Sequence, residues 1–350
     1  MKKVLVFQTW GIGDMIMSTP MLGALRQQLP EAAITMVAGS RAAADVIEGS
    51  HLCNEVRVMA PGRMHIKDLI KTLRGFKQDG FDAAILCTRL SPRIAQLVRL
   101  LSGIKMIAGD SMPPRRWGYT HWTAVDPRGH RVTANLSILR TVLPEAEPGP
   151  LYFRIDEESR RYADKGWSDT GLDGRAVMGI HPGSDPQEGK DKRIPIELCR
   201  SVILGFLNDF PDARVVLVLG PADTEVLPLV KGIDERVIVV HDLPLRVVGG
   251  LIAKMQVFLA GDTGLGHMAA ALGVPVVTLA GPTEVVSTRP WNSESVIIRT
   301  EEPLTCMPCY GTKLYGQCPF QQRCMSSIKE EDVSKALSRH FPRRDAAVLA

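Results

Sequence analysis

The stretch GDTGLGHMAAALGVPVVTLAGPT, residues 261–283, decides the fold more than any other part of the chain. It places a polar, glycine-rich turn between the apolar run 257–260 and a helix-prone run that begins at Met268. This order predicts a buried strand, a tight turn and the start of a helix. In a parallel α/β sheet, such a turn lies at the carboxyl end of the strand, and the first N–H groups of the helix favour an anion. The stretch therefore predicts a phosphate-binding turn.

Short apolar runs alternate with helical patterns on both sides of this stretch. In the first half we expect strands at 4–7, 34–37, 56–59, 83–87 and 105–108, and helices at 15–29, 41–48, 66–78 and 92–101. In the second half we expect strands at 176–180, 214–219, 236–240, 256–260 and 275–279, and helices at 195–208, 222–231, 245–254 and 266–272. Such alternation is typical of parallel sheets. The predicted fold is α/β, with two Rossmann-like domains whose parallel sheets face each other across a cleft.

Irregular sequence between about residues 144 and 172 indicates the connection between the domains: it holds several prolines, a charged helical stretch at 157–165 and a glycine-rich end at 171–174. We assign residues 1–158 to an N-terminal domain and 172–328 to a C-terminal domain. Residues 329–350 form a last helix and tail, for which we consider packing back on the N-terminal domain.

The charge is unevenly distributed along the chain. Residues 1–150 hold 19 Lys and Arg against 12 Asp and Glu, whereas the remainder holds 23 against 26. For any single residue, a solvated helix face explains the charge. Taken together, the charges make the first domain basic. A basic domain is typical of proteins that bind an anionic macromolecule or a phosphorylated lipid surface. With 5% aromatic residues and no nucleic-acid-binding motif, we expect no nucleic acid partner.

The turn Gly11-Ile12-Gly13-Asp14 follows the first predicted strand. A dinucleotide fingerprint would need glycine at position 16, where the chain has Ile, and an acid near the end of the second strand, where it has Gly39-Ser40. The spacing therefore excludes the NAD-binding pattern. Asp14 is left with two roles, helix N-cap or general base, and spacing alone favours the cap.

His181-Pro182-Gly183-Ser184 ends the first strand of the second half, and Lys192 follows in a loop. Backbone N–H groups at Gly183 and Ser184, together with this lysine, are suited to hold a diphosphate, although the Walker pattern is absent. A plain surface loop is the alternative interpretation. Spacing alone likewise favours structural roles for His267, as a hydrogen-bonded residue at a helix start, and for Asp262, as a helix cap.

Cys306, Cys309, Cys318 and Cys324 form a cluster in a loop rich in proline and glycine. The gaps of eight and five residues after the first pair are not those of a paired zinc ribbon, so we favour reduced thiols or a labile disulfide over a metal site. No D-x-D, H-E-x-x-H or G-x-S-x-G sequence occurs in the chain. We therefore predict no metal and no cofactor.

Taken together, these patterns resemble the family 9 glycosyltransferases, the bacterial ADP-heptose:lipopolysaccharide heptosyltransferases. The resemblance covers nearly the whole chain, and its most specific part is the opening stretch. Its residues are Gly13-Asp14 with Thr19-Pro20 and Leu25, His181 to Ser184, Lys192 with Pro195, Asp262-Thr263-Gly264 with His267, Ala269 to Ala271, Gly273, Pro275 and Gly281-Pro282-Thr283.

The resemblance implies a GT-B fold and an inverting, metal-independent transfer of heptose from ADP-L-glycero-D-manno-heptose to a lipopolysaccharide inner-core acceptor. It implies Asp14 as general base and Lys192 as a second catalytic residue. Donor binding is implied for Gly183, Ser184, Lys192, Asp262, Thr263, Gly264 and His267. ADP-heptose is then a substrate rather than a cofactor. The basic first domain would meet a phosphorylated lipid A and core acceptor.

We expect a location in the cytoplasm, peripheral to the inner membrane. No window approaches the roughly 18 apolar residues of a spanning helix, and the scattered cysteines suit a reducing compartment. Two other functions stay open from the sequence. One is a sugar-nucleotide 2-epimerase, which needs no acceptor, and the other is a non-catalytic nucleotide-sugar-binding protein.

Overall fold

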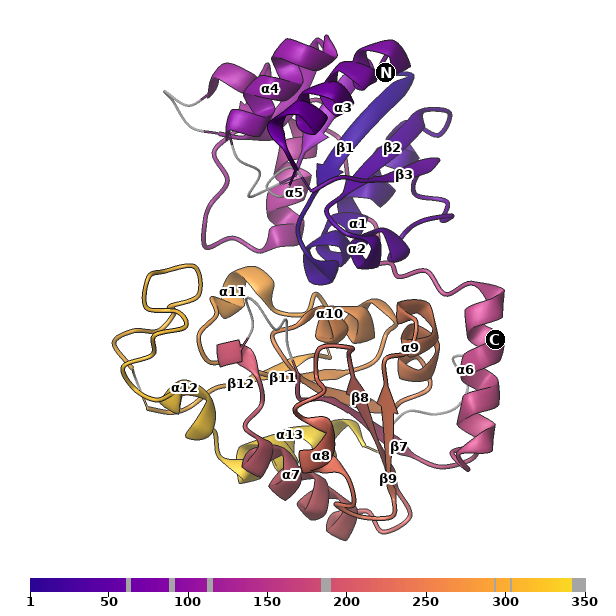
Figure 1. Ribbon diagram of the computed structural model, residues 1–350, viewed down its shortest axis with the longest axis vertical. Helices are drawn as coiled ribbons and strands as arrows, with labels where there is room; N and C mark the ends of the chain where they lie inside the picture. The colour runs from indigo at the N-terminus through magenta and orange to yellow at the C-terminus, as the bar shows by residue number, and fades with distance from the viewer. Residues whose placement is uncertain are drawn as a thin grey trace. The chain divides into compact units, whose positions relative to one another are not determined.

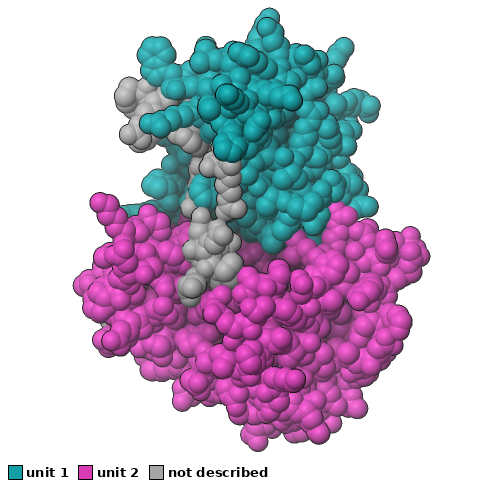
Figure 2. All heavy atoms as spheres, viewed as in Figure 1, with its two compact units in different colours: residues 1–154 teal, residues 155–350 magenta. Residues whose placement is uncertain are grey.

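The computed structural model describes residues 1–60, 64–87, 92–111, 116–183, 190–292, 294–302 and 304–341. The chain divides into two compact units, residues 1–154 and 155–350 (Figure 2). Each has its own sheet covered by helices (Figure 1). None of the helices in the described residues is long and apolar enough to span a membrane.

The first unit is a six-stranded parallel sheet with the order β3-β2-β1-β4-β5-β6. Its strands are β1 (Lys3–Gln8), β2 (Ala33–Ala38), β3 (Glu55–Val58), β4 (Ala83–Leu86), β5 (Met106–Asp110) and β6 (His121–Thr123). Its helices are α1 (Ile12–Gln28), α2 (Arg41–Asp45), α3 (Ile66–Asp79), α4 (Pro92–Ser102), the 3₁₀ turn η1 (Arg116–Gly118) and α5 (Arg131–Arg140).

The helices α3 and α4 cover one face of this sheet. Side chains alternate between the two faces of a strand, so Leu5 and Phe7 of β1 point to the same side. There they join Leu73 and Phe76 of α3 and residues of α4 in one apolar cluster. The rings of Phe7 and Phe76 meet edge to face, with centroids 6.0 Å apart. The outer sides of α3 and α4 therefore form one surface of the first unit.

The second unit repeats the same topology with the order β12-β11-β10-β7-β8-β9, again all parallel. Its strands are β7 (Val177–His181), β8 (Arg214–Leu219), β9 (Val237–His241), β10 (Val257–Gly261), β11 (Val276–Leu279) and β12 (Val296–Ile298). Its helices are α6 (Glu157–Asp169), η2 (Lys190–Lys192), α7 (Ile196–Asp209), α8 (Leu227–Val230), α9 (Leu245–Ile252), α10 (Gly264–Ala271), α11 (Val285–Thr288), α12 (Arg323–Ser326) and α13 (Glu330–His340).

Counted from its own first strand, each sheet has the Rossmann order 3-2-1-4-5-6. The strand order reverses between β1 and β4 in the first unit and between β7 and β10 in the second. Open α/β sheets bind ligands at the carboxyl ends of the strands on either side of such a reversal. The two-domain α/β prediction is confirmed, and β10 is the strand that precedes the stretch 261–283.

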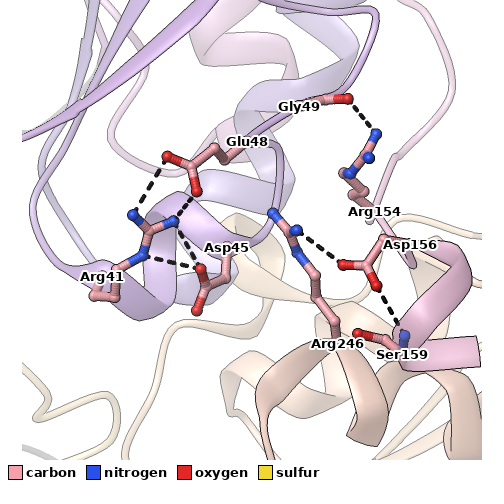
Figure 3. Close-up of polar contacts among 8 residues, drawn as sticks. All are labelled: Arg41, Asp45, Glu48, Gly49, Arg154, Asp156, Ser159 and Arg246. Carbon is pink, nitrogen blue, oxygen red and sulfur yellow. Dashed lines mark hydrogen bonds and ion pairs between the residues drawn. The ribbon is translucent and has the colours of Figure 1, made fainter. Parts of the chain in front are cut away.

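The polar contacts on either side of residue 155 each stay within one unit. Within the first unit, the guanidinium of Arg154 donates to the carbonyl oxygen of Gly49. Within the second, Asp156 caps α6 by accepting from the N–H of Ser159 at 2.8 Å and pairs with Arg246 at 3.0 Å (Figure 3). Arg246 lies on α9, against which α6 packs. The segment that the sequence analysis assigned to the connection therefore contains a helix of the second unit.

The last helix, α13, contributes to the core of the second unit. Its buried Val333 and Leu337 belong to the same apolar cluster as residues of α7 and β8. Phe341 follows it and packs edge to face on Phe206, with ring centroids 4.7 Å apart. From the sequence, residues 329–350 were a separate segment, for which packing back on the first domain was considered. The buried side of the helix instead completes the second core, because its apolar residues recur at helical spacing.

Candidate functional site

The predicted phosphate turn has the geometry of an open helix N-terminus. β10 ends at Gly261 and α10 begins at Gly264, with Thr263 as an extended N-cap residue that makes no side-chain capping bond. No acidic residue lies in the first turn of α10. The first N–H groups of a helix have no partner inside the helix, and they carry the positive end of its dipole. This turn therefore favours an anion.

Asp262 and His267 face each other beside this turn. The Nε2 atom of His267 lies 3.8 Å from an Asp262 oxygen, and Thr288 of α11 donates to the other oxygen at 3.0 Å. Burial raises the pKa of the Asp262 carboxyl, but the contacts with His267 and Thr288 and the nearby charge of Lys192 together lower it below its usual value. Asp262 is therefore an anion held by three neighbours.

The N-cap role that spacing favoured for Asp262 is wrong, because Thr263 occupies the N-cap position of α10. His267 is buried at the start of this helix, as its structural interpretation expects, and its Nε2 atom faces Asp262. Its buried Nδ1 atom has no hydrogen-bond partner among the described residues. The buried hydroxyl of Thr263 also lacks a partner there. Buried polar atoms are nearly always hydrogen-bonded, so these two atoms have room for further hydrogen bonds beside the turn.

Lys192 reaches the same turn from η2. A Cβ atom at Gly261 would lie 2.6 Å from the carbonyl oxygen of Lys192, so glycine allows the two segments to touch. The ammonium of Lys192 lies 3.7 Å from the centre of the Tyr310 ring. An ammonium over a ring face is attracted by the ring quadrupole. Tyr310 thus fixes the position of this cation beside the turn.

Gly183 follows β7, the neighbour of β10 across the reversal of strand order. A Cβ atom here would lie 2.3 Å from the carboxylate of Asp223, so any larger residue would displace that side chain from its hydrogen bond with Gly220. The N–H of Ile194 donates to Pro182 at 3.0 Å, which closes the loop after β7. Ser184, the other predicted donor contact of this loop, lies outside the described residues.

The cysteine-bearing loop, residues 304–324, packs against the site. Asp191, the neighbour of Lys192, accepts from the N–H of Gly316 at 2.9 Å and from the amide of Gln322 at 2.7 Å. On the other side, the N–H groups of Cys309 and Tyr310 both donate to the carbonyl of Pro282 at 2.9 Å. The loop therefore connects the lysine turn with the end of the stretch 261–283.

All seven cysteines are free thiols. Burial raises the pKa of Cys324 to about 11, and the neighbouring Cys318, Cys309 and Cys306 act in the same direction. Within the described ranges, no group of three or more His, Cys, Asp or Glu side chains is placed to hold a metal ion.

Asp14 lies at the reversal of strand order in the first unit. The N-cap of α1 is Gly11, so Asp14 is the third residue of the helix, and the N-cap prediction is wrong. An acid in the first turn interacts favourably with the helix dipole. Burial raises the pKa of Cys87 to about 12, and the charge of Asp14 adds to this rise, which puts the carboxylate near the end of β4. Asp14 is partly exposed.

Three residues of the site went unnoticed in the sequence analysis: Thr288, Tyr310 and Asp223. Each contacts a predicted residue that is distant in the chain, and no spacing links the pairs. The sequence gives no signal for Tyr310 in particular, since Tyr315 and Phe320 lie in the same loop.

Comparison with known proteins identifies the family of the chain. The model of glycosyltransferase family 9 (heptosyltransferase) matches residues 67–317. A lipooligosaccharide heptosyltransferase 2 of Campylobacter jejuni is 27% identical over 46% of this chain and 49% of its own length. The match thus spans about half of that relative. The lipopolysaccharide heptosyltransferase 3 of Escherichia coli K12 is 26% identical over 94% of this chain and 95% of its own.

A solved structure shares the fold. The crystal structure of a family 9 glycosyltransferase from Veillonella parvula is 24% identical, with a TM-score of 0.79 over 97% of this chain and 96% of that one. Two Rossmann-like units with parallel six-stranded sheets are the GT-B architecture, so the predicted fold family is confirmed.

Proposed function

Because the chain belongs to glycosyltransferase family 9, we propose that it transfers heptose from ADP-L-glycero-D-manno-heptose to the inner core of lipopolysaccharide. The observation that supports this best is the open N-terminus of α10, with Lys192, His267 and the Thr263 hydroxyl gathered beside it. These groups suit a diphosphate, which is the part that a nucleotide-sugar donor presents. Gly183, Ser184, Asp262 and Gly264 complete the proposed donor site.

The proposed reaction is a single displacement. The acceptor hydroxyl attacks the anomeric carbon while its proton passes to the carboxylate of Asp14. The bond from that carbon to the diphosphate oxygen breaks, and ADP leaves with an additional negative charge. One displacement inverts the anomeric configuration.

The departing charge needs electrostatic stabilisation where it develops. The N-terminus of α10 supplies fixed N–H dipoles, and Lys192 supplies a cation held against Tyr310. Preorganised donors of this kind need no reorganisation during the reaction, which is their catalytic advantage. We propose that this pair acts without a divalent metal and that no other cofactor takes part.

The proposed acceptor is a phosphorylated lipid A and core saccharide, met at the cytoplasmic face of the inner membrane. The excess of basic residues in the first 150 positions supports this, since a phosphorylated acceptor is anionic. We propose a peripheral association with that membrane.

The test is a panel of nucleotide sugars offered with truncated lipopolysaccharide acceptors, scored by nucleotide release and product mass. We expect ADP release only when acceptor is present, together with a product heavier by one heptose and of inverted configuration by NMR. Added EDTA should leave the rate unchanged. Conversion of a UDP-sugar without acceptor would instead identify a 2-epimerase. Binding of ADP-heptose with no ADP release on adding acceptor would identify a non-catalytic binding protein.

A further inference from the structure

The outer side of α3 carries a stripe of positive side chains. Lys67, Lys71 and Arg74 recur every three or four residues and are exposed, and the neutral Gln78 continues the row. Residues at this spacing share one side of a helix. The opposite side is formed by Leu69, Leu73 and Phe76, which are buried against the sheet. Lys67, Lys71 and Arg74 are called the α3 stripe below.

The described part of the chain holds no carboxylate paired with the cations of the α3 stripe. None of the three makes an ion pair with any residue that the structure describes. Arginines elsewhere behave differently, as Figure 3 shows for Arg41 with Asp45 and Glu48 and for Arg246 with Asp156. Even the nearby Arg57 is bound by two carboxylates, one of them Asp79 at the end of α3 itself.

Apolar side chains project from the same surface. Leu100 of α4 is 77% exposed and Trp117 of η1 is 76% exposed. α4 packs along α3, and η1 packs on α4. Both helices bury their inner sides in one cluster on one face of the sheet, so their outer sides belong to one surface. Ile66, at the first turn of α3, adds a third exposed apolar residue.

A hollow runs along the stripe. Its volume is about 630 Å³, and it is lined by Lys67, Ile70, Lys71, Arg74, Gly75 and Gln78. Gly75 contributes to it because a Cβ atom at this position would meet nothing within 4 Å. The hollow is therefore framed by cations and open to solvent.

We propose that this outer surface of α3, α4 and η1 docks on a bilayer that contains anionic phospholipids. The inference refines the peripheral membrane contact of the proposed function, on which it rests, by naming the surface. Unpaired lysine and arginine side chains are attracted to anionic headgroups, and their contributions add up. Exposed tryptophan and leucine beside them insert at the interface between headgroups and acyl chains.

Other anionic partners fit this surface less well. A site for one soluble phosphate gathers buried donors around a point, whereas the cations of the α3 stripe are exposed and spread over about 10 Å of helix, from the rise of 1.5 Å per residue. A nucleic acid would be bound by the charges but would leave Leu100 and Ile66 without an apolar environment. A bilayer interface accommodates both the charges and the apolar side chains.

The test measures binding of the full chain to vesicles of phosphatidylethanolamine and phosphatidylglycerol by flotation. We expect the triple variant Lys67→Gln/Lys71→Gln/Arg74→Gln to bind at least about tenfold more weakly, since each basic residue near an anionic surface contributes about 1 kcal/mol. The matched control is Lys165→Gln/Lys231→Gln/Lys335→Gln, which removes the same charge from exposed positions of the second unit. The control should bind like wild type.

The apolar contribution is tested separately with Trp117→Ser, and exposed Tyr162→Ser on α6 is its control. We expect only the Trp117 variant to bind vesicles more weakly. Wild-type tryptophan emission should also shift to the blue on vesicle addition, and this shift should be lost in Trp117→Phe. Thermal melting of every variant checks that it is folded.

Four results would overturn the proposal. The first is no binding of wild type to anionic vesicles, and the second is equal binding to vesicles of phosphatidylcholine alone. The third is an equal loss in both triple variants, which would show a response to net charge only. The fourth is displacement from vesicles by inorganic phosphate or a DNA duplex, but not by chloride of equal ionic strength. None of these measurements needs transferase activity, so they fail or succeed independently of the proposed reaction.

Discussion

The two sheets have the same strand order, yet the helices that start at their reversal points differ in charge. In the first unit, α1 begins at a glycine cap and carries the acid Asp14 in its first turn. In the second, α10 begins after Thr263, an N-cap residue whose side chain makes no capping bond, and its first turn holds no acid. One topology thus offers a carboxylate in one unit and a free helix N-terminus in the other. The difference suits one unit to accept a proton and the other to hold an anion.

The largest effect should follow the loss of the carboxylate. Asp14→Asn removes the proposed base, so we expect transfer to fall about 10²- to 10⁴-fold. ADP affinity, measured by calorimetry, and the melting temperature should stay close to wild type. Asp68→Asn is the control, because Asp68 also lies in the first turn of a helix of this unit. Undiminished turnover of Asp14→Asn would remove Asp14 from the mechanism.

Placing an acid at the start of α10 should remove the difference in charge between the two helix starts. Thr263→Asp puts a carboxylate at the N-cap of α10, where it accepts the N–H bonds and repels a diphosphate. We expect ADP affinity to fall about 100-fold or more while the free energy of unfolding holds or rises. Thr263→Asn caps without charge and should weaken binding far less. Equal affinities of the two variants would show that the anion does not bind at this helix.

A smaller effect is expected at Tyr310. Tyr310→Leu removes the ring under the Lys192 ammonium, which is worth about 0.5–2 kcal/mol, or roughly 2- to 30-fold in affinity. We expect ADP to bind more weakly by this factor, and less weakly than in Lys192→Ala. Tyr310→Phe keeps the ring and should restore binding. A Phe variant as weak as the Leu variant would mean that the hydroxyl, not the ring, matters.

The last prediction concerns the stability of the fold and no change in ligand binding, at α6, a helix of the second unit whose N-cap side chain makes the capping bond that Thr263 of α10 lacks. The N–H of Ser159 and the guanidinium of Arg246 hold the pKa of Asp156 at about 2, below its usual value. We expect Asp156→Ala to lower the free energy of unfolding by about 1–2 kcal/mol at pH 7.

This difference has a defined pH dependence. A lowered pKa stabilises the folded state above the unfolded value near pH 4, and the stabilisation is lost as the pH falls towards 2. The difference between wild type and variant should therefore shrink in that range. Urea unfolding followed by the fluorescence of Trp167, buried on α6, measures it. Exposed Glu158→Ala is the control, and a difference that grows on acidification would contradict the assignment.

The central strands of both sheets were predictable from the sequence because they are buried on both faces. Each reads as an unbroken apolar run, as in Val4–Phe7 and Val257–Ala260, and each lies within two residues of its expected place. Two of the four edge strands, β6 and β12, were missed. Each has only three residues, and β6 begins with His and Trp, so its sequence carries no apolar run.

Helices were less predictable where local signals conflict. α5 was missed because Val132, Thr133 and Ile138 are β-branched and disfavour a helix, which tertiary packing nevertheless stabilises. The helix expected at 222–231 is reduced to Leu227–Val230, because the Asp223 carboxylate accepts from Gly220 and holds the preceding residues in a turn.

The turn 261–264 could be recognised from the sequence because its polar and glycine residues are contiguous. The residues that hold its charged side chains in place could not be recognised in this way. Asp262 depends on Thr288, and Lys192 on Tyr310, and such pairs form only when the chain has folded. Spacing also gave the wrong N-cap for α10 and α1, at Asp262 and Asp14, because cap and ligand-binding residues share the same polar types at helix starts.

The position of α13 has a consequence for the order in which the chain folds during synthesis. The first unit is complete once residue 154 has left the ribosome, so its core forms while the rest is translated. The second unit cannot close its core until Val333, Leu337 and Phe341 emerge, because these residues fill the space beside α7. Until then, the apolar side of α7 is exposed to solvent. A nascent chain stalled before residue 330 should therefore carry a folded first unit and a second unit that binds chaperones.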